Sequence, residues 1–229
     1  MPTPHTLLFD LDGTLVDCSG AIIDATLHVT QIHGLEPPEP VREWARSRIG
    51  RPPRETWEQL GAPDPDAMMA AFGERVIPRM NERLIVLPGV PGALHDVHSA
   101  GHAMAVATTR NSGSARDSLA AAGLLNWFGQ VSGRDLVERP KPAPDVLLHA
   151  LAAVGGRADD ALMIGDSAAD VHAAHAAGMP CWGVLGGIGD EKELREAGAD
   201  FILSGGLGEL PAALRRASPD LLRSEDTRR

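Results

Sequence analysis

The sequence predicts an α/β fold, in which a doubly wound, mostly parallel sheet carries an all-helical domain inserted near the N-terminus. Short, continuously apolar segments such as Thr6–Phe9 and 103–107 alternate with helical segments. This pattern is typical of parallel strands that are covered on both faces. Residues 18–84 lack such apolar strands and show helical periodicity instead. The chain has 229 residues, 43% of them hydrophobic. That is enough for one substantial core, or for a core domain and a small accessory domain.

The first apolar segment, Thr6–Phe9, ends abruptly at Asp10-Leu11-Asp12-Gly13-Thr14. It is therefore interpreted as a buried strand that runs into a carboxylate-rich turn. The insert begins with a helix from about residue 19, which is predicted to end at Gly34 because glycine favours helix ends. Pro78 is expected to kink or end the last helix of the insert. Shorter helices are predicted after the first one, over residues 41–49, 54–60 and 66–83.

After Leu87 the predicted strands and helices alternate along the chain. Each apolar segment is short, and most of the helical segments end at a glycine. We therefore expect one core domain, made of residues 1–17 and 85–229, and one helical domain of residues 18–84. The predicted strands lie at residues 103–107, around 131, and at 161–164, 181–185 and 201–203, and the predicted helices at 90–100, 114–122, 143–154, 168–177, 191–197 and 207–217.

Composition excludes several classes of function. Acidic residues outnumber basic ones 31 to 21, which gives a net charge of −10. A protein that neutralises nucleic-acid phosphates needs the opposite balance, so we expect no nucleic-acid partner. The two cysteines, Cys18 and Cys181, are too far apart in sequence to suggest a disulfide framework or a zinc site. No apolar run approaches 18 residues and no signal peptide is visible, so a cytoplasmic protein without a membrane partner is expected.

Residues that can carry chemistry lie where the predicted strands end. Because the carboxyl ends of parallel strands meet at one edge of a sheet, these side chains are expected to converge there. The candidates are Asp10 and Asp12 after the first strand, Thr108 and Thr109 after the second, Lys141 between two prolines ahead of a helix, and Asp166 and Asp170 after a later strand.

Several carboxylates in one crevice repel one another by roughly 4 kcal/mol per pair at 4 Å and an effective dielectric constant of about 20. A hard cation would make such a cluster tolerable. Oxygen ligands with open coordination positions suit Mg²⁺, which prefers one or two carboxylates, water and a phosphate oxygen. With Lys141, the cation would create a positive pocket for a dianionic phosphoryl group. The predicted cofactor is therefore Mg²⁺ and the predicted ligand a small phosphorylated metabolite.

The motifs resemble those of a known family. Asp10-Leu11-Asp12-Gly13-Thr14-Leu15, Thr108, Lys141 and Gly165-Asp166-Ser167 with Asp170 occur in the order of the four motifs of the haloacid dehalogenase-like hydrolase superfamily. The closer likeness is to its phosphoglycolate phosphatase-like branch, in which a helical cap follows the first motif. The likeness extends from about residue 6 to about residue 210. It implies that residues 18–84 form a cap domain that opens and closes over the site.

The resemblance also implies roles for individual residues. Asp10 would be the nucleophile, which forms an aspartyl-phosphate. Asp12 would protonate the leaving oxygen and then activate water. The side chains of Asp10 and Asp166 and the backbone carbonyl of Asp12 would ligate Mg²⁺.

The remaining roles concern the phosphoryl group and its surroundings. Thr108 and the backbone N–H of Thr109 would hydrogen-bond the transferring oxygens. Lys141 would offset charge between the nucleophile and the phosphoryl group, and Asp170 would orient Lys141 or a metal-bound water. Gly13 would let the chain turn sharply beside the metal.

Other activities of the superfamily fit the sequence less well. Members that dehalogenate carbon substrates lack the second aspartate of the first motif, whereas Asp12 is present here. Members that cleave phosphonoacetaldehyde use a lysine of the cap, but the only lysines of this chain are Lys141 and Lys192. One departure from the family pattern is Thr109, where asparagine is common. It is followed by Arg110, which could change how the leaving group is recognised.

The function predicted from the sequence is Mg²⁺-dependent hydrolysis of a small phosphomonoester, phosphoglycolate-like or a sugar phosphate, by a monomer or homodimer. Two alternatives stay open at this stage. A sugar phosphomutase could use the same Asp10 and Asp12, and a non-catalytic binding protein could share the fold. In the insert, Arg51 and Arg54 are candidate contacts for an acidic leaving group.

Overall fold

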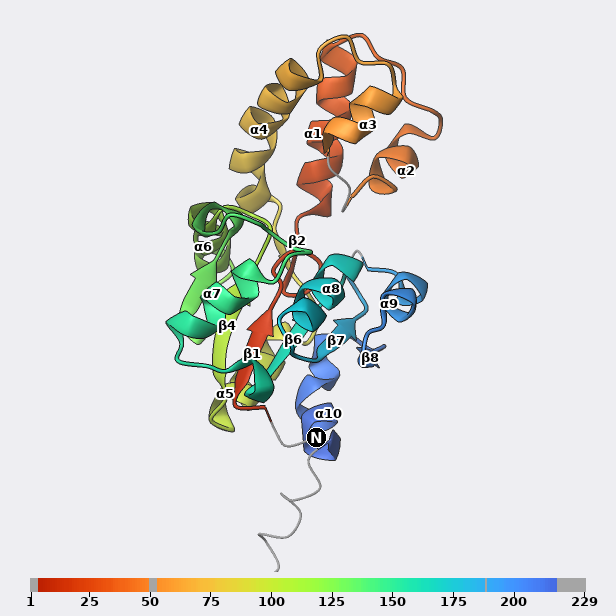
Figure 1. The fold of residues 1–229 in the computed structure, drawn as a ribbon. Coiled ribbons are helices and arrows are strands. Elements are labelled where there is room, and N and C mark those ends of the chain that lie inside the picture. Colours follow the sequence, from red (N-terminus) through yellow and green to blue (C-terminus); the bar gives the residue numbers. More distant parts are fainter. Residues whose placement is uncertain (1–3, 50–52, 188, 218–229) are drawn as a thin grey trace, which may run out of the picture. The chain divides into compact units, whose positions relative to one another are not determined.

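The structure, a computed structural model, describes residues 4–49, 53–187 and 189–217. Within them the strands are β1 (Thr6–Phe9), β2 (Val16–Asp17), β3 (Ile85–Val86), β4 (Ala103–Ala107), β5 (Gln130–Ser132), β6 (Ala161–Gly165), β7 (Cys181–Val184) and β8 (Phe201–Leu203). Six of them form one sheet in the order β5-β4-β1-β6-β7-β8, in which every pairing is parallel. The strands β2 and β3 pair separately (Figure 1).

Helices cover the sheet and make up the insert. In chain order they are α1 (Ser19–Ile32), α2 (Val41–Arg46), α3 (Pro53–Gln59), α4 (Pro65–Glu82), α5 (Val90–Ser99), α6 (Ser112–Ala121), α7 (Asp145–Ala153), α8 (Ala168–Ala176), α9 (Glu191–Ala197) and α10 (Leu210–Ala217). The α/β fold class and the mostly parallel sheet predicted from the sequence are thus confirmed. The helix predicted over residues 207–217 begins later than expected. Residues 207–209 form a separate 3₁₀ turn, and α10 starts at Leu210.

The chain divides by compactness into two units, Met1–Val16 with Val86–Arg229, and Asp17–Ile85. We call the first the core unit and the second the helical unit. The helical unit contains α1 to α4 and two small apolar clusters. In one of them the buried Trp57 packs edge-on against Phe72, with ring centroids 5.6 Å apart, and donates its indole N–H to Thr30 Oγ1 at 3.2 Å. The unit therefore has hydrophobic packing of its own.

Pro78 does not end the helix in which it lies. Helix α4 continues through it to Glu82, which corrects one of the two outcomes expected for this proline. Proline costs a helix one backbone hydrogen bond and crowds the preceding turn. However, Val76 and Met80 on either side of Pro78 are buried, and α4 packs along α1. We attribute the continuation to this apolar packing.

The sheet of the core unit is apolar on both faces because helices lie on both. Leu8, Met163 and Cys181 belong to the core cluster formed with α7, α8 and α9. Successive strand residues point to opposite faces, so Leu7 and Phe9 point the other way. These two are also fully buried. Helices α5 and α10, which contact each other, lie behind the sheet in Figure 1. Continuous burial explains why the strands lack polar alternation.

The strand order decides which loops meet. Strand β1 is flanked by β4 and β6, and Phe9 is in register with Val106 on one side and with Ile164 on the other. The segments that follow these three strands therefore leave the sheet at the same level. They begin with Asp10, Thr108 and Asp166.

Candidate active site

The segment after β1 is a tight turn that closes on itself. The amides of Leu15 and Val16 both donate to the carbonyl of Leu11, at 3.0 and 3.1 Å, and the amide of Gly13 donates to the carbonyl of Val16 at 2.8 Å. Gly13 has φ of +89°, a conformation that favours glycine. The turn begins at Asp10, which is buried with 6% of its surface exposed. A sharp, hydrogen-bonded turn thus places a carboxylate at the end of the central strand.

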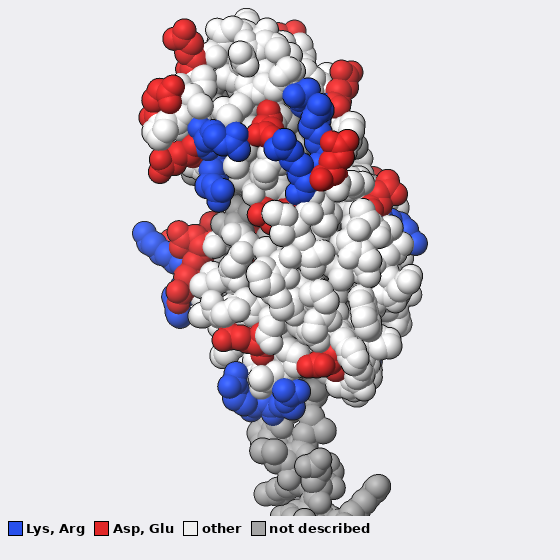
Figure 2. All heavy atoms as spheres, turned by 180° about the vertical axis from the view of Figure 1, so that it is seen from behind, with Lys and Arg blue, Asp and Glu red and all other residues white. Residues whose placement is uncertain are grey.

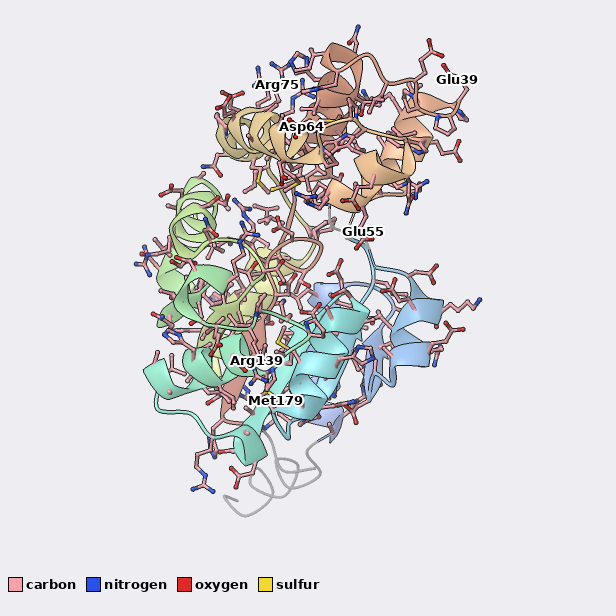
Figure 3. The ribbon with its side chains drawn as sticks, turned by 45° about the horizontal axis from the view of Figure 1, so that its top comes forward. Glu39, Glu55, Asp64, Arg75, Arg139 and Met179 are labelled. Atoms are coloured by element: carbon pink, nitrogen blue, oxygen red, sulfur yellow. The ribbon has the colours of Figure 1, made fainter. Side chains whose placement is uncertain are left out.

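Lys141 joins two aspartates that are distant in sequence. Its Nζ donates to Asp10 Oδ1 at 2.6 Å and to Asp170 Oδ1 at 2.5 Å, and its side chain is only 2% exposed. Arg139, two residues earlier and labelled in Figure 3, instead forms a surface ion pair with Asp145 at 2.9 Å. The structure therefore brings together the predicted nucleophile, the predicted lysine and the predicted orienting aspartate.

Asp170 is held at the start of a helix. It is the third residue of α8, and its Oδ2 accepts hydrogen bonds from the amide of Ser167 at 3.1 Å and from the Ser167 hydroxyl at 2.6 Å. This reciprocal capping satisfies the first turn of the helix. Gly165 is needed beside it, because a Cβ at that position would lie 2.4 Å from Asp170 Cγ. Asp170 thus caps α8 with one oxygen and holds Lys141 with the other.

Burial dominates the electrostatics of this group. Burial raises the pKa of Asp10 to about 7. The positive charge of Lys141 opposes this rise, and the negative charge of Asp170 adds to it. For Lys141, burial by itself would lower the pKa, but the carboxylates of Asp10 and Asp170 outweigh it, so the pKa is raised. Lys141 therefore stays protonated at neutral pH, whereas the carboxyl of Asp10 titrates close to neutral pH.

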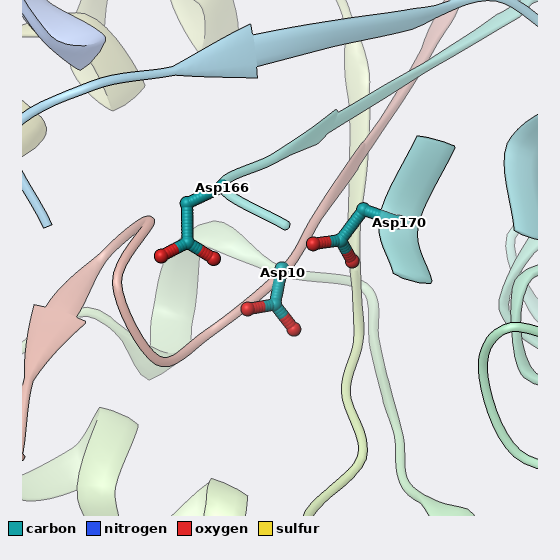
Figure 4. Close-up of side chains that lie close together, drawn as sticks. All are labelled: Asp10, Asp166 and Asp170. Carbon is teal, nitrogen blue, oxygen red and sulfur yellow. The ribbon is translucent and has the colours of Figure 1, made fainter. Parts of the chain in front are cut away.

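Asp166 completes a cluster of three buried carboxylates. One oxygen each of Asp10, Asp166 and Asp170 lies within 4.8 Å of the others, and the three side chains turn toward one another in Figure 4. Asp166 Oδ2 accepts the amide of Gly189 at 3.1 Å. Gly13 faces the same oxygen so closely that a Cβ would lie 1.9 Å from it. The first-motif turn and the segment after β6 are thus in close contact.

The donors of this cluster suit a hard divalent cation. All are carboxylate oxygens, and hard cations prefer oxygen ligands. Asp170 has both oxygens engaged, by Lys141 and by Ser167. Asp10 and Asp166 are therefore the side chains of the cluster best placed to hold a cation.

Thr108 is oriented by the residues that follow it. It is buried, and its amide donates to the carbonyl of Ser132 at 2.9 Å. Its Oγ1 accepts the amide of Arg110 at 3.2 Å. Because the hydroxyl accepts here, its proton is available for donation to another oxygen. Thr109 beside it is exposed. A hydroxyl donor and an exposed residue thus follow β4, next to β1.

Asp12 has a partner that sequence reasoning did not identify. Arg110 Nη1 donates to Asp12 Oδ1 at 3.3 Å, and the side chains of Arg110 and Asp12 are 10% and 21% exposed. The sequence marked Arg110 only as a departure from the family pattern. Its contact with Asp12 spans 98 residues of sequence, so only the pairing of β1 with β4 reveals it.

Two glycines that follow β7, Gly187 and Gly189, also lie close to the site. A Cβ on Gly187 would lie 1.9 Å from the carbonyl oxygen of Gly13, and one on Gly189 would lie 1.9 Å from the carbonyl oxygen of Asp166. These glycines therefore let the segment approach the carboxylate cluster. In the sequence, only their position after a predicted strand could have pointed to the site. The sequence did not show that this strand, β7, lies beside β6.

Of the two arginines predicted to contact the leaving group, the structure describes one. Arg51 lies outside the described residues. Arg54, in α3, donates to Glu58 at 3.2 Å and also forms an ion pair with Asp66. Both partners belong to the helical unit, so the guanidinium of Arg54 is engaged there by two carboxylates.

Acidic and basic side chains are mixed on one face of the molecule. On the face shown in Figure 2, basic side chains lie among acidic ones and do not form a continuous basic surface. Among the described helices, none has the length and apolar character needed to cross a membrane.

Comparison with known proteins places the chain in a family. A family model described as haloacid dehalogenase-like hydrolase matches residues 7–184. The chain is 35% identical over 206 residues to a probable phosphatase, IndB, from Dickeya dadantii, and the match covers 86% of this chain and 88% of that protein. It is 33% identical over 207 residues to a phosphoglycolate phosphatase from Caulobacter vibrioides, with 86% of each chain covered.

A solved structure shows the same fold. A haloacid dehalogenase-like family hydrolase from Streptococcus pneumoniae superimposes with a TM-score of 0.83 at 22% identity, and the match covers 93% of this chain and 99% of that one. The resemblance inferred from the four motifs is thus confirmed. The chain belongs to the haloacid dehalogenase-like hydrolases.

Proposed function

We propose that this chain is a Mg²⁺-dependent phosphatase that hydrolyses a small phosphomonoester through a phosphoaspartate on Asp10. The observation that carries the proposal is the buried Lys141, which bridges Asp10 and Asp170 beside Asp166. The phosphatase names of two relatives support the same reaction class. In this proposal the helical unit is the cap that the family resemblance implies.

The first half-reaction transfers the phosphoryl group. A carboxylate oxygen of Asp10 attacks phosphorus while the bond from phosphorus to the leaving oxygen breaks. Asp12 gives its proton to that oxygen, and the alcohol departs.

The second half-reaction hydrolyses the phosphoaspartate. Asp12 takes a proton from water as the water oxygen attacks the phosphorus. The bond between phosphorus and Asp10 breaks, inorganic phosphate forms, and Asp10 is regenerated as a carboxylate.

The other residues stabilise charge. Lys141 stays protonated next to Asp10 and offsets the negative charge shared by nucleophile and phosphoryl group. Thr108 donates its hydroxyl proton to a phosphoryl oxygen, and the backbone N–H of Thr109 is a second donor. Asp10, Asp166 and the carbonyl of Asp12 would hold a Mg²⁺ ion, which would supply further positive charge for the phosphoryl group.

The proposal is tested with a panel of small phosphomonoesters, including phosphoglycolate and hexose phosphates, by measuring phosphate release. Turnover is expected with Mg²⁺, loss of turnover with a chelator, and recovery when Mg²⁺ is added back. Failure to hydrolyse any member of the panel would contradict the reaction class, and full activity in the chelator would contradict the metal requirement. Formation of a hexose 6-phosphate from the 1-phosphate, without free phosphate, would instead identify a phosphomutase.

Substitution of Gly13 tests the contact between the turn and Asp166. In Gly13→Ala the new Cβ collides with Asp166 Oδ2, and φ of +89° is unfavourable for alanine. We expect the Mg²⁺ concentration for half-maximal activity to rise by about 10- to 100-fold, the range typical of changes around metal ligands. The measurement is a Mg²⁺ titration of phosphatase activity.

Gly92→Ala in α5 is the matched control, because a Cβ there meets nothing within 4 Å. Its Mg²⁺ dependence should equal that of the unmodified chain. An unchanged titration for Gly13→Ala would show that Asp166 tolerates displacement and would remove it from the proposed ligands.

A further inference from the structure

The guanidinium of Arg110 is anchored in the core unit and extends toward Asp12. Its Nη2 donates to the carbonyl oxygen of Ser114 at 3.1 Å, to the Ser114 hydroxyl at 2.8 Å and to the Ser118 hydroxyl at 2.8 Å. Its Nη1 donates to Asp12 Oδ1 at 3.3 Å. Because a guanidinium is planar and rigid, three contacts to α6 on one nitrogen fix the direction of the other. Helix α6 thus holds a donor against the Asp12 carboxyl.

The backbone of Arg110 is fixed as well. Its carbonyl oxygen accepts the amide of Arg134 at 2.9 Å, and a Cβ on Gly133 would lie 2.4 Å from that oxygen. Nearby, Asp135 accepts the amide and the hydroxyl of Ser112, at 2.6 and 2.7 Å. The segment after β5 therefore holds the segment that carries Arg110, and the guanidinium extends from a defined backbone position.

Arg110 also contacts the other predicted phosphoryl-handling residue of this edge. Its amide donates to Thr108 Oγ1 at 3.2 Å, which leaves the hydroxyl proton of Thr108 for another acceptor. One residue therefore orients the carboxyl of Asp12 with its side chain and the hydroxyl of Thr108 with its backbone.

We propose that Arg110 is a positioning residue, which holds the Asp12 carboxyl where it can give its proton to the leaving oxygen. This inference rests on the proposed phosphatase function. A general acid must lie within about 2.6–3.2 Å of the atom that it protonates, so the orientation of its carboxyl matters. Asp12 is 21% exposed, and without Arg110 its side chain would lose this hydrogen bond, which restrains its rotamer, and would turn more freely toward solvent.

The leaving group distinguishes this role from a structural one. An alkoxide leaves poorly and needs a proton, whereas nitrophenolate leaves without one. In Arg110→Met, kcat/KM for the best alkyl phosphomonoester of the panel should fall by about 10- to 100-fold, part of the total that a general acid contributes. For p-nitrophenyl phosphate it should fall by no more than about 3-fold. The ratio of the two kcat/KM values reports the first transfer step, because that step includes departure of the leaving group.

Three further variants make the result interpretable. Arg110→Lys keeps the charge but cannot reach both α6 and Asp12 with one fork, so it should restore the ratio only in part. Ser118→Ala removes one anchor of Nη2 and should change the ratio in the same direction, but less. Arg157→Met is the matched control, since this arginine is 77% exposed, pairs with Asp159 ahead of β6 and should leave the ratio unchanged. Ser118→Ala also keeps the test decisive should Arg110→Met fail to fold.

The outcomes are distinct. A selective loss on the alkyl substrate supports the positioning role. An equal fall on both substrates, or no fall, in a folded Arg110→Met protein would overturn it and leave the proposed phosphatase function intact. If the unmodified chain hydrolyses neither substrate, the proposed function itself fails.

Discussion

Replacing Asp10 with asparagine is expected to abolish phosphate release from p-nitrophenyl phosphate, a loss of about 10⁴-fold or more, as is typical when a nucleophile is removed. Asparagine has nearly the same size, but its amide cannot form the acyl phosphate. The fold should persist, because Lys141 keeps its ion pair with Asp170 at 2.5 Å. Turnover is measured by phosphate release, and the phosphoenzyme by acid-quenching the reaction with labelled substrate.

The exposed Asp96 in α5 provides the matched control, since its side chain is 59% exposed. Asp96→Asn makes the same chemical change away from the site and should retain full activity. Comparable turnover in Asp10→Asn and the unmodified chain would refute the assignment of Asp10 as nucleophile.

The second large effect is expected for Lys141→Met, on stability as well as activity. Methionine fills similar volume but leaves Asp10 and Asp170 buried without their shared cation. Removing one partner of a buried ion pair typically costs about 3–5 kcal/mol. We expect a decrease of that size in the free energy of unfolding, measured by urea denaturation in the presence of a chelator. Phosphatase activity should be lost with it.

The loss of stability should depend on pH. Burial already raises the pKa of Asp10 to about 7, and Lys141 opposes that rise. Without the lysine the pKa rises further. A carboxyl whose pKa is raised in the folded chain binds a proton that the unfolded chain has released, so stability falls as pH rises through that window. The deficit of Lys141→Met relative to the unmodified chain should therefore be larger at about pH 8 than at about pH 5.

Lys192→Met is the control for both measurements. Its side chain is 81% exposed and lies 3.8 Å from Glu196, an exposed pair that contributes little to stability. Its unfolding free energy should stay close to that of the unmodified chain at both pH values. A Lys141→Met protein as stable as this control would show that the two carboxylates do not depend on the lysine.

Local signals were enough for most elements of the fold. Apolar segments such as Thr6–Phe9 are too short and too uniform for surface helices, and glycines such as Gly101 and Gly178 adopt positive φ beyond helix ends. Local signals failed where distant packing decides the result. Helix α4 continues through Pro78 because the nearby Val76 and Met80 are buried. The short pairing of β2 with β3 joins segments far apart in sequence.

Of the site, sequence order and chemistry pointed to Asp10, Asp12, Lys141, Asp166 and Asp170, because acidic and basic residues at strand ends have few purely structural uses. Three of these, Asp10, Lys141 and Asp170, form one hydrogen-bonded group in the structure. Their roles in catalysis stay predictions.

The sequence by itself determined the fold class, the family and the residue types at the strand ends, since each depends on periodicity or on a short motif. Only the tertiary structure decided that Asp170 engages Lys141 and caps its own helix, that Gly187 and Gly189 approach the carboxylates, and that Arg110 holds Asp12. The physical reason is that hydrogen bonds and close contacts depend on distances of a few ångströms. Those distances are set by the order and register of the strands, which no local stretch of sequence encodes.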